Sequence, residues 1–208
     1  LPQEARLLLL PGPQGLSIVY GVSTEFAMSR LDDEVHPEAH VFVEDRGAEI
    51  LLREILASDN KTAELLGRIA ISAVGPANVV AMLGKLAKEG KLPYKALAIL
   101  DGDHADANCS TLPGLVAPER LVYDGLREKG WPNLSQRFGV GAGFLFTALE
   151  DAMREPDHHR WNAKVGDQIL KSSVSVWEVM SSEWCKACLS DDDRKRLFDQ
   201  ITGVVAGE

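Results

Sequence analysis

The sequence predicts an α/β fold with a mostly parallel sheet flanked by helices, plus a helical appendage. Three short apolar runs support the sheet, at residues 41–43, 68–74 and 94–100. Runs of this length that are rich in aliphatic residues are typical of strands buried on both faces of a parallel sheet. Helix-length segments separate the runs, and this alternation is the pattern of parallel α/β units.

The first half of the chain is predicted to hold every strand. A short strand at Leu16–Tyr20 comes first, followed by a helix that Ser23 caps and that ends near Leu31. Helices over Ala48–Ala57 and Val79–Lys88 are expected between the three buried strands. Residues 104–117 contain Asn, Ser, Thr, Pro and Gly and are predicted to form a loop.

Only helices are expected after this loop. They begin at Pro118, near Phe144, at Asp157, at Val174, and at Asp191 behind the N-cap residue Ser190. The large aromatic residues Trp161, Trp177 and Trp184 are expected to pack in the core of this half. We therefore predict an α/β catalytic domain over residues 1–130 and an α-helical subdomain over residues 131–208.

Composition narrows the class of protein. The 208 residues carry 31 acidic and 22 basic side chains, and the net charge of −9 argues against a general nucleic-acid-binding surface. Three cysteines, an odd number, favour a reducing, cytoplasmic compartment over a disulfide framework. No apolar run approaches the ~20 residues that span a bilayer, so no membrane contact is expected. The chain starts at Leu1, and we expect it to be a piece of a longer protein.

Carboxylates stand directly after two of the predicted strands. Glu44 follows Val41–Val43, and Asp101 and Asp103 follow the run that ends at Leu100. The carboxyl ends of parallel strands meet at one edge of a sheet, which is where open α/β sheets bind ligands. Three unpaired carboxylates there repel one another, and a hard divalent cation with oxygen ligands relieves that repulsion.

The same residues carry a resemblance to a known family. A glutamate after one strand and an Asp-x-Asp after a later one resemble the topoisomerase-primase (TOPRIM) domain, here as Glu44 and 101–103. The motifs Val-Glu-Asp-x-x-Ala at 43–48, Leu-Pro-Gly at 112–114 and Pro-Glu at 118–119 are similar to the C-terminal nuclease region of the overcoming-lysogenization-defect (OLD) family. Members of that family join an ABC-type ATPase to a TOPRIM nuclease, and related proteins act in phage defence.

The chain departs from these families at three positions. Asp45 stands where the general TOPRIM pattern has Gly, and Ala105 where the topoisomerase branch often has a third aspartate. Ala48 stands where some OLD-type enzymes have a second acid, with Glu49 next to it. No G-x-x-x-x-G-K-[ST] motif occurs, so the ATPase half is not part of this chain.

The resemblance implies a metal-dependent DNA endonuclease that uses two Mg²⁺ or Mn²⁺ ions. Asp101 and Asp103 are the expected core ligands, and Glu44 is a ligand or a general base. Glu119 would complete the second metal position, and Glu49 is a further candidate ligand. Lys164 and Lys171, from the helical half, are candidates for stabilising charge in the transition state. The implied partners are DNA, an ATPase domain outside this chain, and a second copy in a full-length homodimer.

Other residues with chemical potential are expected to serve structure. His104 is predicted in an exposed loop, and His158 and His159 at the surface. Their neighbours Arg160 and Lys164 could contact a phosphate backbone. Cys185 and Cys188 have zinc-ligand spacing, but no second pair accompanies them and they fall within a predicted helix.

Two other functions use the same acidic strand ends. One is a Mg²⁺-dependent phosphotransfer or regulatory α/β domain in which an aspartate accepts the phosphoryl group. Its phosphatase form places Asp-x-Asp near the first strand and continues to Thr or Val, where this chain has a late pair and Ala105. The other is a catalytically silent TOPRIM module that serves assembly.

Overall fold

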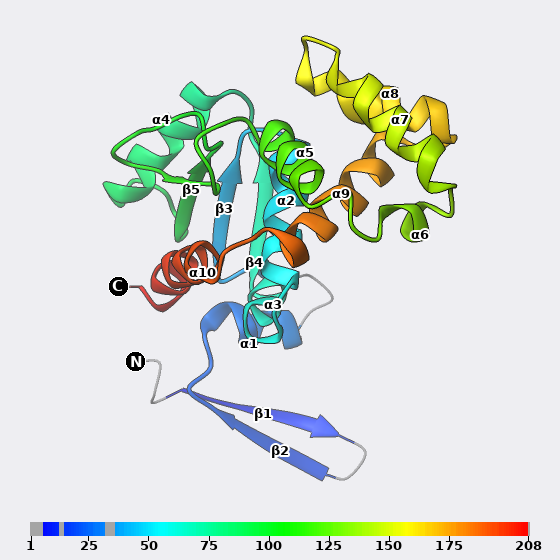
Figure 1. The fold of residues 1–208 in the computed structure, drawn as a ribbon. Helices are drawn as coiled ribbons and strands as arrows, with labels where there is room; N and C mark the ends of the chain where they lie inside the picture. The colour runs from blue at the N-terminus through cyan, green and yellow to red at the C-terminus, as the bar shows by residue number, and fades with distance from the viewer. Residues whose placement is uncertain (1–5, 13–14, 32–35, 208) are drawn as a thin grey trace.

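A four-stranded parallel sheet forms the centre of the computed structural model, which describes residues 6–12, 15–31 and 36–207. The strand order is β4 (Ile69–Ala73), β3 (Ala39–Val43), β5 (Ala96–Leu100) and β6 (Ser110–Thr111). In this register Val41 lies between Ile71 and Leu97. The predicted α/β fold with a parallel sheet flanked by helices is confirmed at this level (Figure 1).

Helices cover both faces of the sheet. On one face, Val80 of α4 (Ala77–Lys88) packs against Ala98 and Leu100 of β5. On the other face, α2 (Arg46–Ala57) and α10 (Asp191–Ala206) pack over the aliphatic side chains of β3 and β5. Alternate residues of each strand therefore enter different layers, as the two-residue period of a strand requires.

Two strands were not predicted. The first is β1 (Leu7–Gly12), which pairs antiparallel with β2 (Gly15–Tyr20), and this hairpin projects away from the sheet (Figure 1). The second is β6, which lies inside the segment predicted as a loop and pairs only with Ile99 and Leu100. A two-residue strand has too little apolar pattern to stand out from loop sequence.

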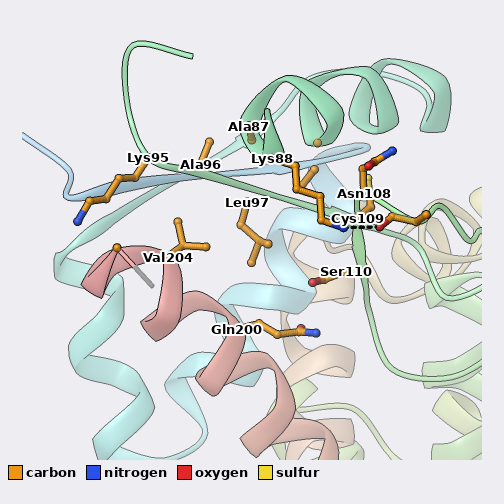
Figure 2. A pocket seen from close by; sticks show the side chains of 14 residues that line it. Ala87, Lys88, Lys95, Ala96, Leu97, Asn108, Cys109, Ser110, Gln200 and Val204 are labelled. Carbon is orange, nitrogen blue, oxygen red and sulfur yellow. Dashed lines mark hydrogen bonds between the residues drawn. The ribbon is translucent and has the colours of Figure 1, made fainter. Parts of the chain in front are cut away.

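Because β6 is so short, the edge of β5 at residues 96–98 opens into a pocket of about 620 Å³. Figure 2 shows Leu97 and Ser110 on its sheet side and Gln200 and Val204 on α10. No carboxylate is among the residues that line this pocket. It is therefore unlike the acidic edge predicted for the site.

The helices of the second half have the predicted order, with one addition and with the helix predicted from Asp157 divided into two. They are α5 (Pro118–Glu128), α6 (Leu134–Phe138), α7 (Ala142–Met153), the 3-10 helix η3 (His158–Arg160), α8 (Trp161–Ile169), α9 (Ser173–Ala187) and α10. The short α6 was not predicted. The first half also holds α1 (Thr24–Leu31), α3 (Asn60–Ala63) and the 3-10 helix η2 (Glu64–Gly67).

The predicted aromatic core of the helical half is confirmed. Trp161, Trp177 and Trp184 are all buried and belong to one hydrophobic cluster that also contains the apolar face of α2. Helix α9 packs against α2, and α10 packs against α2, β3 and β5. The core is thus continuous across the predicted boundary near residue 130, and the division into two domains stays a prediction.

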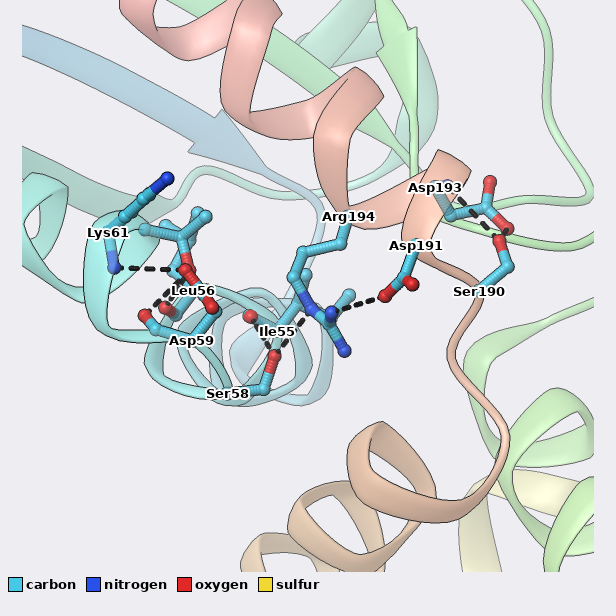
Figure 3. Close-up of polar contacts among 10 residues, drawn as sticks. Ile55, Leu56, Ser58, Asp59, Lys61, Ser190, Asp191, Asp193 and Arg194 are labelled. Atoms are coloured by element: carbon cyan, nitrogen blue, oxygen red, sulfur yellow. Dashed lines mark hydrogen bonds and ion pairs between the residues drawn. The ribbon is translucent and has the colours of Figure 1, made fainter.

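Polar contacts hold α10 against the C-terminal end of α2. The guanidinium of Arg194 donates to the hydroxyl of Ser58, the C-cap of α2, at 3.0 Å, and pairs with Asp191 at 2.7 Å (Figure 3). Ser190 caps α10 by accepting from the backbone N–H of Asp193 at 3.1 Å, as predicted. Among the described residues, no helix is both long enough and apolar enough to cross a bilayer.

Candidate functional site

Three of the predicted acidic residues, Glu44, Asp101 and Asp103, meet in a pocket of about 350 Å³ at the carboxyl edge of the sheet. The ends of β3, β4 and β5 supply its floor, and the loop before α5 and the start of η3 supply the rest. The lining residues are Glu44, Asp45, Gly75, Pro76, Asp101, Asp103, His104, Ala117, His158 and His159. This is the position at which the strand ends of an open parallel sheet bind ligands.

Glu44 is held in place by the neighbouring strands. Its carboxylate Oε1 accepts a hydrogen bond from the backbone N–H of Asp101 at 3.0 Å, which links the end of β3 to the end of β5. Its backbone carbonyl accepts from the N–H of Gly75 at 3.0 Å, just beyond β4. The neighbouring strand ends therefore fix both the backbone of Glu44, from β4, and its carboxylate, from β5.

Asp103 and His104 form the exposed side of the pocket. The imidazole Nδ1 of His104 lies 3.3 Å from Asp103 Oδ1 and 3.4 Å from Glu44 Oε1. Both side chains are at least 40% exposed, whereas that of Glu44 is 12% exposed. His104 is in a loop, as predicted, but it also bridges two of the predicted site residues.

Asp101 is a half-buried carboxyl group with no lysine or arginine partner among the described residues. Its Oδ1 is buried and has no hydrogen-bond partner within the described part of the chain. Burial, followed by repulsion from Glu44, Asp45, Glu119 and Asp103, raises the pKa of Asp101 to about 8. An acid in this state gains stability either from a proton or from a cation.

The other buried glutamates show how this chain treats a structural carboxylate. Glu38 pairs with Arg68, Glu49 pairs with Arg46 and Arg53, and Glu183 pairs with Arg137 and Lys186. Glu44 and Glu119, which are buried to a similar degree, have no lysine or arginine partner within the described ranges and face histidines instead. The acids of this edge therefore lack the permanent cations that the structural ones have.

Two glycine-containing motifs pack against each other beside the acids. A Cβ atom on Gly102 would lie 2.8 Å from the carbonyl oxygen of Gly114 and 2.9 Å from that of Pro113. Gly114 itself has a φ of +86°, a conformation that favours glycine. The Asp-Gly-Asp turn and the Leu-Pro-Gly segment are therefore a single packed unit.

Asp45 serves the start of α2. Its Oδ1 accepts from the N–H of Ala48 at 2.8 Å, the usual contact of a helix N-cap. This contact explains the acid at the position where the TOPRIM pattern has Gly, and it adds one more negative charge to the lining of the pocket.

Glu119 lies at the first turn of α5, as predicted, and its partners are the two histidines expected at the surface. His159 Nδ1 is 3.2 Å from Glu119 Oε1, and His158 Nε2 is 3.9 Å from Glu119 Oε2. The His158 side chain is only 21% exposed. His158 was predicted at the surface, but its side chain is mostly covered. Both imidazoles line the acidic pocket. Only the adjacent pair of histidines hinted at this in the sequence.

Three predicted site residues lie elsewhere. Glu49 is on α2, where Arg46 at 2.8 Å and Arg53 at 3.0 Å occupy its carboxylate through i,i+3 and i,i+4 spacing. Lys164 pairs with Glu155 at 2.8 Å, and Lys171 follows α8. None of the three lines the pocket, and its lining contains no lysine or arginine.

Comparison with protein-family models, with curated proteins and with solved structures finds no match to this chain. Fold and site together define an α/β protein with a cluster of carboxylates and imidazoles at the carboxyl edge of a parallel sheet.

Proposed function

We propose that this chain is a TOPRIM-type nuclease domain of the OLD family that hydrolyses phosphodiester bonds in DNA with the help of two divalent cations. The observation that carries the proposal is the convergence of Glu44, Asp101 and Asp103 on one pocket without a lysine or arginine partner among the described residues. Clustered acids without counter-charges, two of them partly buried, are costly to a fold and are typical of functional sites.

The donor set fits Mg²⁺ or Mn²⁺. All three candidate ligands offer carboxylate oxygens, the donors that these hard ions prefer. Asp101 Oδ1 is buried and has no hydrogen-bond partner among the described residues, which fits a role as a metal ligand. Once bound, such ions activate a water for attack and stabilise the leaving oxygen.

The residues of the chain orient this chemistry. The N–H of Asp101 holds the Glu44 carboxylate, so that its free oxygen is directed by the backbone rather than by a flexible partner. Asp103 is the more exposed acid and lies where a substrate phosphate would approach. His104 lies between Asp103 and Glu44, and its imidazole Nδ1 is close enough to contact either carboxylate.

The proposed reaction also needs a cation that stabilises the charge of the transition state. Lys164 and Lys171 are still proposed for it, although Lys164 is paired with Glu155 in the free protein. The histidines of the pocket are the nearest alternatives. The OLD resemblance further proposes a cytoplasmic protein of phage defence, with an ATPase domain and a second copy as partners.

A cleavage assay tests the proposal. Supercoiled plasmid is incubated with the chain and Mg²⁺, Mn²⁺, Ca²⁺ or EDTA, and nicked and linear products are measured. We expect cleavage with Mg²⁺ or Mn²⁺ and none with EDTA. Asp103→Asn should abolish it, because that change removes a ligand charge at constant size.

The matched control is Asp106→Asn. Asp106 lies in the same loop and bonds to Asn108, but it does not line the pocket. Wild-type cleavage by Asp106→Asn and none by Asp103→Asn supports the site. Equal cleavage by wild type, Asp101→Asn and Asp103→Asn, prepared identically, would show that the activity does not come from these acids.

The same samples distinguish the nuclease from the two alternatives, a phosphotransfer domain and a catalytically silent assembly module. A phosphotransfer domain would form an adduct on Asp101 or Asp103 with acetyl phosphate and Mg²⁺, which mass spectrometry detects, and would leave plasmid intact. A silent assembly module would bind cations without either product.

A further inference from the structure

Glu119, His158 and His159 bring three potential metal ligands together from two distant parts of the chain. One ligand atom from each residue lies within 4.8 Å of the others. Each carboxylate oxygen of Glu119 faces a different imidazole, at 3.2 Å for His159 and 3.9 Å for His158. The imidazole rings are themselves adjacent, with centroids 4.2 Å apart.

Packing and capping contacts position the elements that carry Glu119 and the two histidines. The hydroxyl of Tyr123, one turn after Glu119 on α5, donates to Asn162 Oδ1 at 2.9 Å, and its ring packs on Trp161. The backbone N–H of His159 bonds to Asp157 at 3.1 Å, which caps η3. The ligands therefore stand on packed elements rather than on a free loop, as a preorganised site requires.

The spacing of the three groups suits a transition metal. Ligand bonds of ~2.0–2.2 Å place neighbouring donor atoms about 3–3.5 Å apart in tetrahedral or octahedral geometry. The distances of 3.2 and 3.9 Å need only small side-chain shifts to reach this range. The remaining coordination positions would open to the acidic pocket, which both imidazoles line.

The chemistry of the donors selects the ion. Two imidazole nitrogens and one carboxylate suit Zn²⁺ or Mn²⁺, whereas Mg²⁺ prefers oxygen ligands alone. Salt bridging alone is a weaker explanation, because buried structural glutamates of this chain, such as Glu183, are paired with arginine or lysine.

We propose that Glu119, His158 and His159 form a binding site for a divalent transition-metal ion, separate from the all-carboxylate position of Glu44, Asp101 and Asp103. A catalytic role for this ion, as the second ion of the nuclease, rests on the proposed function. Binding of the ion is independent of that function, so binding and cleavage are measured separately.

The test measures Zn²⁺ binding by calorimetry with the full chain, and Co²⁺ binding by visible absorption. The wild type is compared with His158→Ala/His159→Ala, with Glu119→Gln, with Asp101→Asn/Asp103→Asn and with His104→Ala. The His104→Ala variant is the matched control, since it removes an imidazole from the same pocket but not from this cluster.

We expect the double-histidine and Glu119→Gln variants to lose Zn²⁺ affinity by at least about tenfold, the range for loss of a contributing ligand or its support. The double-aspartate and His104→Ala variants should stay within about threefold of wild type, and excess Mg²⁺ should not displace Co²⁺. Glu119→Gln keeps the size of the side chain. If the double-histidine variant fails to fold, the Zn²⁺ affinity of Glu119→Gln tests the site instead.

Two results would overturn the proposal. One is Zn²⁺ affinity that survives both the histidine and the Glu119→Gln changes. The other is a thiolate-to-Co²⁺ charge-transfer band, which would place the ion on a cysteine. Zn²⁺ binding without plasmid cleavage would contradict the proposed function and leave this site standing. Cleavage that persists without the two histidines would keep the nuclease and remove the catalytic role of this ion.

Discussion

The indole N–H of Trp177 donates a 2.8 Å hydrogen bond to the backbone carbonyl of Gly47 and so joins α9 to the first turn of α2. The two residues are 130 positions apart. Gly47 lies three residues after Glu44, and a Cβ atom on it would come within 3.2 Å of Asp45 Oδ1. The helical half thereby supports the segment that presents Glu44 and the helix cap at the edge of the pocket.

Trp177→Phe should test this support. It should lower the free energy of unfolding by about 1 kcal/mol more than Trp184→Phe does, because it also removes a hydrogen bond. Trp184 is equally buried, and its indole has no hydrogen-bond partner among the described residues. Urea unfolding of both variants measures the difference, and equal losses would show that the bond to Gly47 contributes nothing beyond packing.

Gly102→Ala should disrupt the site through the backbone. The added methyl group would meet the carbonyl oxygens of Gly114 and Pro113 at 2.8 and 2.9 Å, and neither can move without shifting the Leu-Pro-Gly segment. We expect a loss of about 1–3 kcal/mol in stability, typical of overpacking, together with weaker Mn²⁺ binding. Gly143→Ala, where nothing lies within 4 Å, should be neutral or slightly stabilising in the same measurements.

Glu49 should stabilise the folded state at neutral pH and lose this contribution at acidic pH. Burial by itself raises the pKa of Glu49, but hydrogen bonds from Arg46 and Arg53 outweigh burial, and the net pKa lies below its usual 4.5. A carboxyl whose pKa is lowered by folding stabilises the folded state above its unfolded pKa and loses that contribution as the pH falls through its folded pKa.

Thermal or urea unfolding should therefore show wild type more stable than Glu49→Gln by about 1 kcal/mol at pH 7, with the gap closing below about pH 4. Glu54→Gln on the same helix is the control, because Glu54 has no ion pair in the described part of the chain. A gap between wild type and Glu49→Gln that is the same at pH 7 and pH 3.5 would contradict this role. Because Glu49 does not line the pocket, its variant should keep wild-type Mn²⁺ affinity.

Divalent cations should stabilise the folded chain. An ion that relieves repulsion among Glu44, Asp101 and Asp103 binds only the folded state, and at about 100 times its Kd it adds about 2.7 kcal/mol. For a chain of this size that corresponds to a rise of about 5–10 °C in Tm. Scanning calorimetry with EDTA and with Mg²⁺, which prefers oxygen ligands, measures the rise, which should be much smaller in Asp101→Asn and unchanged in Asp106→Asn. Identical melting of the wild type in EDTA and in Mg²⁺ would show that the carboxylates of the pocket do not bind the ion.

Much of the fold could be predicted because its signals are local. The runs at 41–43, 68–74 and 94–100 are apolar enough to identify buried strands, and the caps at Ser23 and Ser190 mark helix starts. Parallel strands present their carboxyl ends at one edge, so Glu44 and Asp101 could be placed together from their positions alone. The strand β6 and helix α6 escaped prediction because two and five residues carry almost no periodicity.

The sequence by itself determined which segments are buried strands, where the longer helices begin, and which acids reach the edge of the sheet. The spacing of Arg46 and Arg53 around Glu49 is local too, so the pairing of Glu49 within its own helix could be predicted from the sequence. Only the tertiary structure decided that Glu119 meets His158 and His159 across 40 residues. The reason is physical. Periodicity and capping act between near neighbours, but the partner of a buried charge depends on how α5, η3 and α8 pack around Tyr123 and Trp161, and no local pattern encodes that packing.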